Sequence, residues 1–170
     1  MKRRTFIQFS VISTLLFTTN YSIAKTIPSN TIVLLEEIFQ IIFPKTKNMP
    51  SSTEFGALEY LILNISHRTF DDSDKTFILN GANDFLNSFP EFFNLTKDEK
   101  QQLIFSIVKE NYYARSWISK LTYYGLEGMF SDPLYGGNKN QIAWKSINHN
   151  VGYPRPKKTY GQKIWFMMFV

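Results

Sequence analysis

Apolar residues recur every three or four positions through the middle of the chain, and this spacing limits its fold more than any other feature. The segment TIVLLEEIFQIIF, residues 31–43, carries one broad apolar stripe made of Leu34, Leu35, Ile38, Phe39 and Ile42. Residues three and four apart share one face of a helix, so the stripe predicts an amphipathic α-helix. Pro44 follows directly and cannot continue it.

The same spacing continues in two further segments. The segment SSTEFGALEYLILNI, residues 51–65, starts with Ser and Thr, which favour a helix N-terminus, and its apolar positions are Phe55, Leu58, Ile62 and Ile65. The segment DKTFILNGANDFLNSF, residues 74–89, repeats the pattern at Ile78, Ala82, Phe85 and Phe89. Each segment predicts another amphipathic helix.

A last helical segment opens with a capping box. In Thr96-Lys97-Asp98-Glu99, Thr96 and Glu99 can each satisfy a free backbone N–H at a helix start. The apolar positions that follow are Leu103, Ile107 and Val108. The pattern is expected to run on, with a break, toward Trp117 and Leu121.

These segments define the expected fold class. Alternating β-branched runs bounded by hairpin turns are missing from the sequence, so we expect an all-α protein, an irregular bundle of about five helices with a long Gly/Pro/aromatic C-terminal loop region. A length of 170 residues suits one domain, and 44% hydrophobic residues suit a globular core. The single helical domain is expected over residues 25–170.

The N-terminal sequence is typical of an export signal. In MKRRTFIQFSVISTLLFTTNYSIAK, a basic start precedes an apolar stretch, and a small-x-small pattern ends at Ala24. We therefore expect residues 1–24 to be a signal peptide. The export motif resembles the twin-arginine type in Arg3, Arg4, Phe6 and Ile7. Twin-arginine export moves folded proteins, so the motif predicts a periplasmic chain that crosses with a folded partner.

Candidate reactive groups are few. The sequence has no cysteine, which excludes disulfides, thiolate metal sites and covalent haem attachment. His67 and His149 are the only histidines, and neither has a partner at metal-ligand spacing. The acids Asp71, Asp72 and Asp74 are interpreted as a helix start rather than a calcium loop. We expect no catalytic residue, no metal site and no cofactor bound by this chain.

Charge is unevenly placed along the chain. The net charge is +5, and no acid follows Asp132, while six Lys and Arg residues do. A basic tail suits an acidic partner, anionic lipid or nucleic acid, and a solvated surface is the plain alternative. We do not expect a nucleic-acid partner.

Turn residues and aromatics gather in residues 128–156, GMFSDPLYGGNKNQIAWKSINHNVGYPRP. This stretch holds four of the eight glycines and three of the seven prolines. Such residues make stiff turns that display aromatic side chains at little entropic cost, as interface hot spots do. Asn138 is expected to cap a short helix that carries Trp144. The alternative, which is compatible with the first, is that the aromatics close the end of the bundle.

We predict a partner interface in this stretch. Its residues are Phe130, Asp132, Pro133, Tyr135, Gly136, Gly137, Asn138, Trp144, Tyr153 and Arg155.

Three features together resemble the gluconate 2-dehydrogenase subunit 3 family. They are the twin-arginine leader, a helix ending in Ile-Ile-Phe-Pro, and above all Gly-Met-Phe-Ser-Asp-Pro-Leu-Tyr-Gly-Gly-Asn followed by Ala-Trp-Lys. The resemblance spans nearly the whole mature chain and only its last block is specific. Asn148-His149-Asn150-Val151 and the tail after Lys157 depart from the pattern.

The resemblance implies a non-catalytic role. In that family the small subunit carries the export signal and stabilises an FAD-dependent catalytic large subunit that oxidises a sugar or sugar acid. A cytochrome c subunit with haem often passes electrons to the membrane. The expected partners are therefore the flavoprotein, a cytochrome c subunit where one is present, and the twin-arginine translocase during export. The expected location is the periplasm, peripheral to the inner membrane. The alternative is an independent periplasmic helical binding protein.

Overall fold

The computed structural model describes residues 27–153, 155 and 157 of the chain. The predicted leader, with its export motif and Ala24, lies outside these residues, as do Pro154, Pro156 and the tail from residue 158. The described part contains no strand. Its helices are α2 (Ser29–Ile42), α3 (Ser52–Phe55), α4 (Ala57–Ile65), α5 (Asp72–Ser88), α6 (Lys97–Glu110), α7 (Tyr112–Phe130), α8 (Ile142–Ser146) and the 3₁₀ turns η1 (Phe92–Asn94), η2 (Pro133–Tyr135) and η3 (Lys139–Gln141).

The all-α prediction is confirmed, but the described residues form seven α-helices where about five were expected. Two backbone breaks contribute to the difference. Gly56 adopts the left-handed conformation, with φ at 81°, and splits residues 51–65 into α3 and α4. Asn111 is extended and its side chain accepts a hydrogen bond from the N–H of Ala114, so α7 begins as a new helix where a break had been expected.

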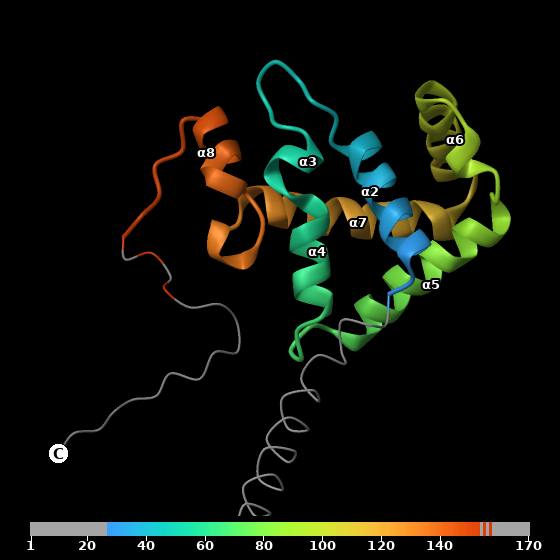
Figure 1. Ribbon diagram of the computed structural model, residues 1–170, viewed down its shortest axis with the longest axis horizontal. Coiled ribbons are helices and arrows are strands. Elements are labelled where there is room, and N and C mark those ends of the chain that lie inside the picture. Colours follow the sequence, from blue (N-terminus) through green and yellow to red (C-terminus); the bar gives the residue numbers. More distant parts are fainter. Residues whose placement is uncertain (1–26, 154, 156, 158–170) are drawn as a thin grey trace, which may run out of the picture.

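The longest described helix, α7, is the centre of the bundle. It packs against α2, α3, α4, α5, α6 and α8. Figure 1 shows α8 at one end of α7 and α6 at the other, with α4 and α2 crossing it between them. Two glycines of α7 permit this close crossing. A Cβ at Gly125 would lie 2.2 Å from a ring carbon of Phe43, and one at Gly128 would lie 2.8 Å from Tyr60.

The core follows the predicted apolar stripes closely in α2 and α5. Leu34, Leu35, Ile38 and Phe39 are fully buried, as are Ile78 and Ala82. The predicted sets of buried residues in α4 and α6 were partly wrong. In α4 the buried residues include Tyr60 and Leu61, while Leu58 and Ile62 are half-buried, because this helix packs against both α2 and α7. In α6 the buried apolar residue is Ile104.

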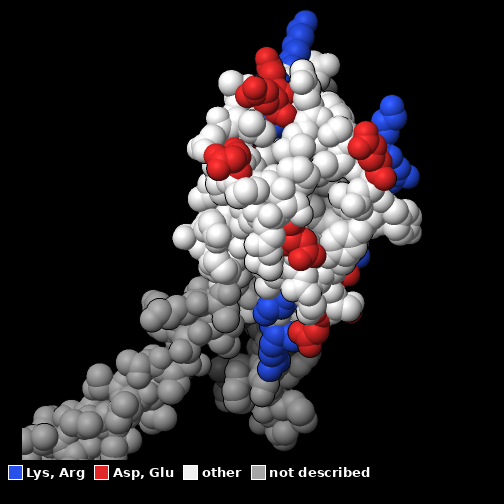
Figure 2. Space-filling view, turned by 90° about the vertical axis from the view of Figure 1, so that its right-hand side faces the viewer, with Lys and Arg blue, Asp and Glu red and all other residues white. Residues whose placement is uncertain are grey.

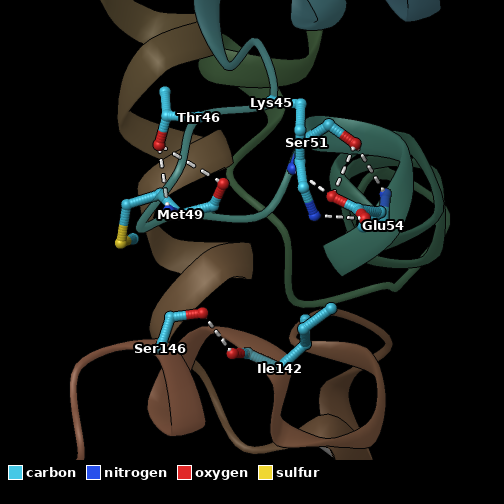
Figure 3. A network of polar contacts seen from close by, with 7 residues as sticks. All are labelled: Lys45, Thr46, Met49, Ser51, Glu54, Ile142 and Ser146. Atoms are coloured by element: carbon cyan, nitrogen blue, oxygen red, sulfur yellow. Dashed lines mark hydrogen bonds and ion pairs between the residues drawn. The ribbon is translucent and has the colours of Figure 1, made fainter.

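The loop between α2 and α3 is tied at both ends. The N–H of Ser52 donates to the carbonyl of Phe43 (2.9 Å). Figure 3 shows Lys45, Ser51 and Glu54 gathered at the start of α3, where Ser51 and Glu54 form a capping box and Lys45 pairs with Glu54. This loop is therefore held by its polar groups as well as by the burial of Pro50 and the packing of Met49 on the core.

The predicted capping box of α6 is confirmed. Thr96 accepts a hydrogen bond from the N–H of Glu99, and the Glu99 carboxylate accepts one from the N–H of Thr96 (2.8 Å). The acids at residues 71–74 likewise start a helix, since Asp71 accepts from the N–H of Asp74 at the beginning of α5. Figure 2 looks at the end of the molecule where α5 and α6 lie, and its charged side chains are of both signs and scattered among uncharged ones.

Candidate partner-binding site

The residues after α7 form a compact loop built from two 3₁₀ turns and α8. Asp132 starts η2 by accepting a hydrogen bond from the N–H of Leu134 (3.0 Å). Gly136 ends it with φ at 93°, a conformation that favours glycine. The loop then returns so closely to α7 that a Cβ at Gly137 would lie 2.2 Å from the carbonyl oxygen of Gly128. Glycine is therefore required at both positions of this turn.

Asn138 lies at the centre of the loop and is fully buried. Its side-chain Nδ2 donates to the carbonyl of Ser131 (3.1 Å), and its Oδ1 accepts from the N–H of Ala143 (3.0 Å). The side chain thus ties the end of α7 to the first turn of α8. The predicted short helix is present as α8. Gln141 occupies its N-cap position, and the Asn138 side chain accepts a hydrogen bond from a backbone N–H of its first turn.

A side-chain clamp closes the far side of the loop. Arg155 donates to both carboxylate oxygens of Asp132, with Nε and Nη2 distances of 2.9 to 3.0 Å. The same guanidinium lies 5.8 Å from the ring centroid of Trp144. Trp144 is 8% exposed, and its Nε1 donates to the carbonyl of Phe130 (3.0 Å). Asp132, Trp144 and Arg155, here called the Asp132–Arg155 clamp, come together from both ends of the loop.

Exposure divides the predicted interface residues into three groups. Gly137, Asn138 and Trp144 are buried within the chain itself. Phe130 is 41% exposed and Tyr153 is 90% exposed. The half-buried residues are Asp132, Pro133, Tyr135, Gly136 and Arg155. The structure thus brings the predicted residues into one loop, and only part of them face outward. Contact with a partner remains a prediction for all of them.

Sequence reasoning missed a second exposed surface next to this loop. Tyr123, Leu126 and Phe130 of α7 are 58%, 45% and 41% exposed, and their spacing places them on one helix face. We call these three residues the α7 ridge. The signal was present in the sequence, because the ridge lies beside the buried stripe of Trp117, Leu121 and Tyr124 at similar helical spacing.

The two histidines lie in separate places. His67 follows α4, and its Nδ1 is hydrogen-bonded to the Thr69 hydroxyl (2.8 Å). His149 lies beside the ring of Trp144, with 5.8 Å between the centroids. Among the described residues, His, Asp and Glu side chains form no group of three or more that could hold a metal ion. No described helix is both long and apolar enough to span a membrane.

The fold and the site define a small all-α protein whose C-terminal loop is fixed by side-chain clamps. A sequence model of the family described as gluconate 2-dehydrogenase subunit 3 matches residues 30–152. The chain belongs to this family, and the predicted resemblance is confirmed. The match covers nearly all of α2 and everything from there through α8, and it ends three residues before Arg155 of the clamp. No curated protein and no solved structure matches the chain.

Proposed function

We propose that this chain is the non-catalytic small subunit of a flavin-dependent dehydrogenase complex of the gluconate 2-dehydrogenase kind. In this role it carries the export signal and stabilises the folded catalytic subunit in the periplasm, at the surface of the inner membrane. The observation that carries the proposal is the family match, which extends over nearly all of the described residues. The partners are the flavoprotein, a cytochrome c subunit where one is present, and the translocase during export.

The geometry of the loop supports a docking role. Its inner residues are already hydrogen-bonded within the chain, so Phe130, Tyr135 and Tyr153 are displayed on a frame that needs no ordering on binding. A preformed loop loses little conformational entropy when a partner covers it, and exposed aromatics supply the contact area. These features suit a subunit that recognises a folded protein.

The division of labour within the complex follows from the sequence. The chain has no cysteine, so a covalently attached haem c belongs to another subunit. We assign FAD to the catalytic subunit as well. The small subunit then contributes the twin-arginine motif at Arg3 and Arg4, which lies outside the described residues, and a surface that keeps the loaded flavoprotein attached during export.

A fractionation experiment tests this function. The C-terminally tagged chain is expressed in its native host with Arg3 and Arg4 both replaced by Lys, and tagged material is purified separately from periplasm and cytoplasm. We expect the flavin-containing partner to be retained with the chain in the cytoplasm of the variant and in the periplasm of the wild type. Lys2→Arg is the matched control, because it also exchanges lysine and arginine at constant charge, outside the arginine pair.

The outcomes separate the proposal from its alternative. Flavin that reaches the periplasm equally in the double variant would show that the partner does not depend on this leader. A chain that enters the periplasm alone and carries no partner would favour the independent binding protein.

A further inference from the structure

A cavity of about 230 Å³ opens beside the candidate site, between α4, the turn after it and α7. Aromatic and acidic side chains dominate its wall, namely Tyr60, Phe70, Tyr123, Tyr124, Asp71 and Glu127. Asn64, His67 and Thr69 are the other lining residues, and no Lys or Arg of the described part of the chain lines the cavity. The combination of aromatic faces with carboxylates gives this cavity a distinct chemistry.

The aromatic wall is held in place by contacts behind it. The rings of Phe70 and Tyr123 each lie 5.2 Å from the ring of Tyr124. The Tyr124 hydroxyl donates to Asp74 (2.6 Å), and Lys120 pairs with the same carboxylate. Burial, followed by the hydrogen bond to Asp74, raises the pKa of Tyr124 well above its usual value, so the phenol stays protonated. The charge of Asp74 is therefore offset behind the wall.

The two carboxylates of the rim make the cavity attractive to cations. Hydrogen bonds from the Ser73 hydroxyl and from the N–H of Asp74 hold the pKa of Asp71 below its usual value, so it is ionised at neutral pH. Glu127 supplies a second carboxylate from α7. Aromatic faces and carboxylates both favour ammonium or guanidinium groups. The same charges repel a sugar acid, which argues against a copy of a gluconate site.

The cavity lies next to the clamped loop. Tyr60 forms part of its wall and also lies beneath the loop, since a Cβ at Gly136 would lie 3.8 Å from the Tyr60 Cα. Along α7, the ridge runs from Tyr123 at the cavity through Leu126 to Phe130 at the loop. A free amine would fill the cavity but leave this apolar ridge in water. A protein surface would cover the cavity and the ridge together.

We propose that the α7 ridge and the cavity extend the partner interface, with an Arg or Lys side chain of the catalytic subunit entering the cavity. This inference rests on the proposed function. The ridge packs against apolar residues of that subunit, while Glu127 and Asp71 neutralise the incoming cation. The pairing of a central basic side chain with aromatic contacts is the pattern that dominates interface energies.

The test compares charge reversal at Glu127 of α7 with the same reversal at the end of α6. The purified flavoprotein that co-purifies with the wild-type chain is the probe, and its dissociation constant is measured against immobilised wild type, Glu127→Lys and Glu110→Lys. We expect Glu127→Lys to weaken binding at least about tenfold. Glu110→Lys makes the same charge change at the exposed end of α6 and should stay within about twofold of wild type. Leu126→Ser is a second variant that removes apolar area from the ridge and should also weaken binding.

Each outcome decides one claim. Far-UV circular dichroism confirms that each variant is folded, and Glu127→Gln, which preserves shape, replaces any Glu127→Lys protein that is not. If the flavoprotein binds wild type, Glu127 variants and Leu126→Ser equally well, this surface is not the interface, while the proposed function stands. If no flavoprotein co-purifies with the wild type, the proposed function itself fails.

Discussion

The helical core and the C-terminal loop of this chain are stabilised in different ways. The core is made of apolar side chains from α2, α4, α5 and α7, and residues such as Leu34 and Leu121 are fully buried. The loop from residue 131 to 155 depends instead on a few specific contacts, chiefly those of Asn138, Trp144 and the Asp132–Arg155 pair. Core packing tolerates many apolar substitutions, whereas a hydrogen-bonded loop depends on individual residues.

A loop can thus be held in one conformation without a large core of its own. In the loop, the buried polar groups of Asn138 and the indole N–H of Trp144 each satisfy a backbone group of another segment. Residues that resembled binding anchors in the sequence thereby act as the internal frame. The outward-facing Phe130 and Tyr153 are left as the candidates for direct contact.

The largest effect is expected in the core. Trp117 is 2% exposed, and its Nε1 donates to the carbonyl of Ile78 (3.1 Å). We expect Trp117→Ala to lower the free energy of unfolding by about 4 kcal/mol, because it leaves a cavity and removes the indole hydrogen bond to Ile78. Urea denaturation followed by circular dichroism measures this. A loss below about 1 kcal/mol would contradict the packing described for α5 and α7.

Trp144→Ala should have the second largest effect, and we expect it to destabilise the isolated chain even without a partner. We expect a loss of about 3 kcal/mol in unfolding free energy, because the indole is buried against Arg155 and its N–H bond to Phe130 is removed. Trp144→Phe is the matched control that keeps part of the packing. An unchanged free chain with a weakened complex would instead identify Trp144 as a direct anchor, with the loss of roughly 2 kcal/mol typical of such residues.

Asn138→Ala should cost about 2 kcal/mol, because it leaves the Ser131 carbonyl and the Ala143 N–H without their partner. Asn138→Asp keeps the acceptor for Ala143 but places a buried carboxylate against the Ser131 carbonyl, so it should destabilise the chain at least as much as Asn138→Ala. Thermal denaturation of both variants measures the two effects. Equal midpoints for Asn138→Ala and wild type would show that the loop is not held at this residue.

Breaking the Asp132–Arg155 pair should have a smaller effect. The Arg155 side chain is one-third exposed, so Asp132→Asn is expected to cost about 1 kcal/mol, less at high salt. A double-mutant cycle with Arg155→Gln measures the coupling between them. A coupling energy near zero would show that the Asp132–Arg155 ion pair does not stabilise the loop and that only the contacts of Trp144 do.

The smallest effect is the pH dependence from the helix caps. Hydrogen bonds hold the pKa values of Glu54, Asp71 and Glu99 below their usual values of 4.5, 3.8 and 4.5. As the pH falls, these carboxylates are protonated in the unfolded chain before they are protonated in the folded chain. The stability that they contribute is therefore fully present above their unfolded pKa values and is lost as the pH falls through their folded pKa values. Denaturation at pH values from 6 downward to about 3 should show the loss. The Glu99→Gln variant should show a shallower decline, and identical slopes would contradict the capping role of Glu99.

Much of the core could be predicted from periodicity, because helical spacing determines which side chains are buried. The stripe of α2 and the capping box at Thr96 were predictable on local grounds. The break at Gly56 was harder, since glycine occurs inside helices as well as at their ends. The residues that α4 and α6 bury were not predictable, because they depend on which neighbouring helices these two helices contact.

The candidate site was predictable as a segment but not as a surface. Turn residues located the loop, yet the burial of Trp144 depends on Arg155, eleven residues further along the chain. The ridge and its cavity escaped prediction because α4 and α7, which line the cavity, are far apart in sequence. Long-range contacts of this kind leave no periodic signal.

The most direct test of the account is co-purification of the C-terminally tagged chain from the native periplasmic membrane fraction, followed by an absorbance spectrum. We expect a stoichiometric partner of flavoprotein size with flavin bands, and haem bands where a cytochrome is present. A chain that is recovered alone, folded and colourless would contradict it.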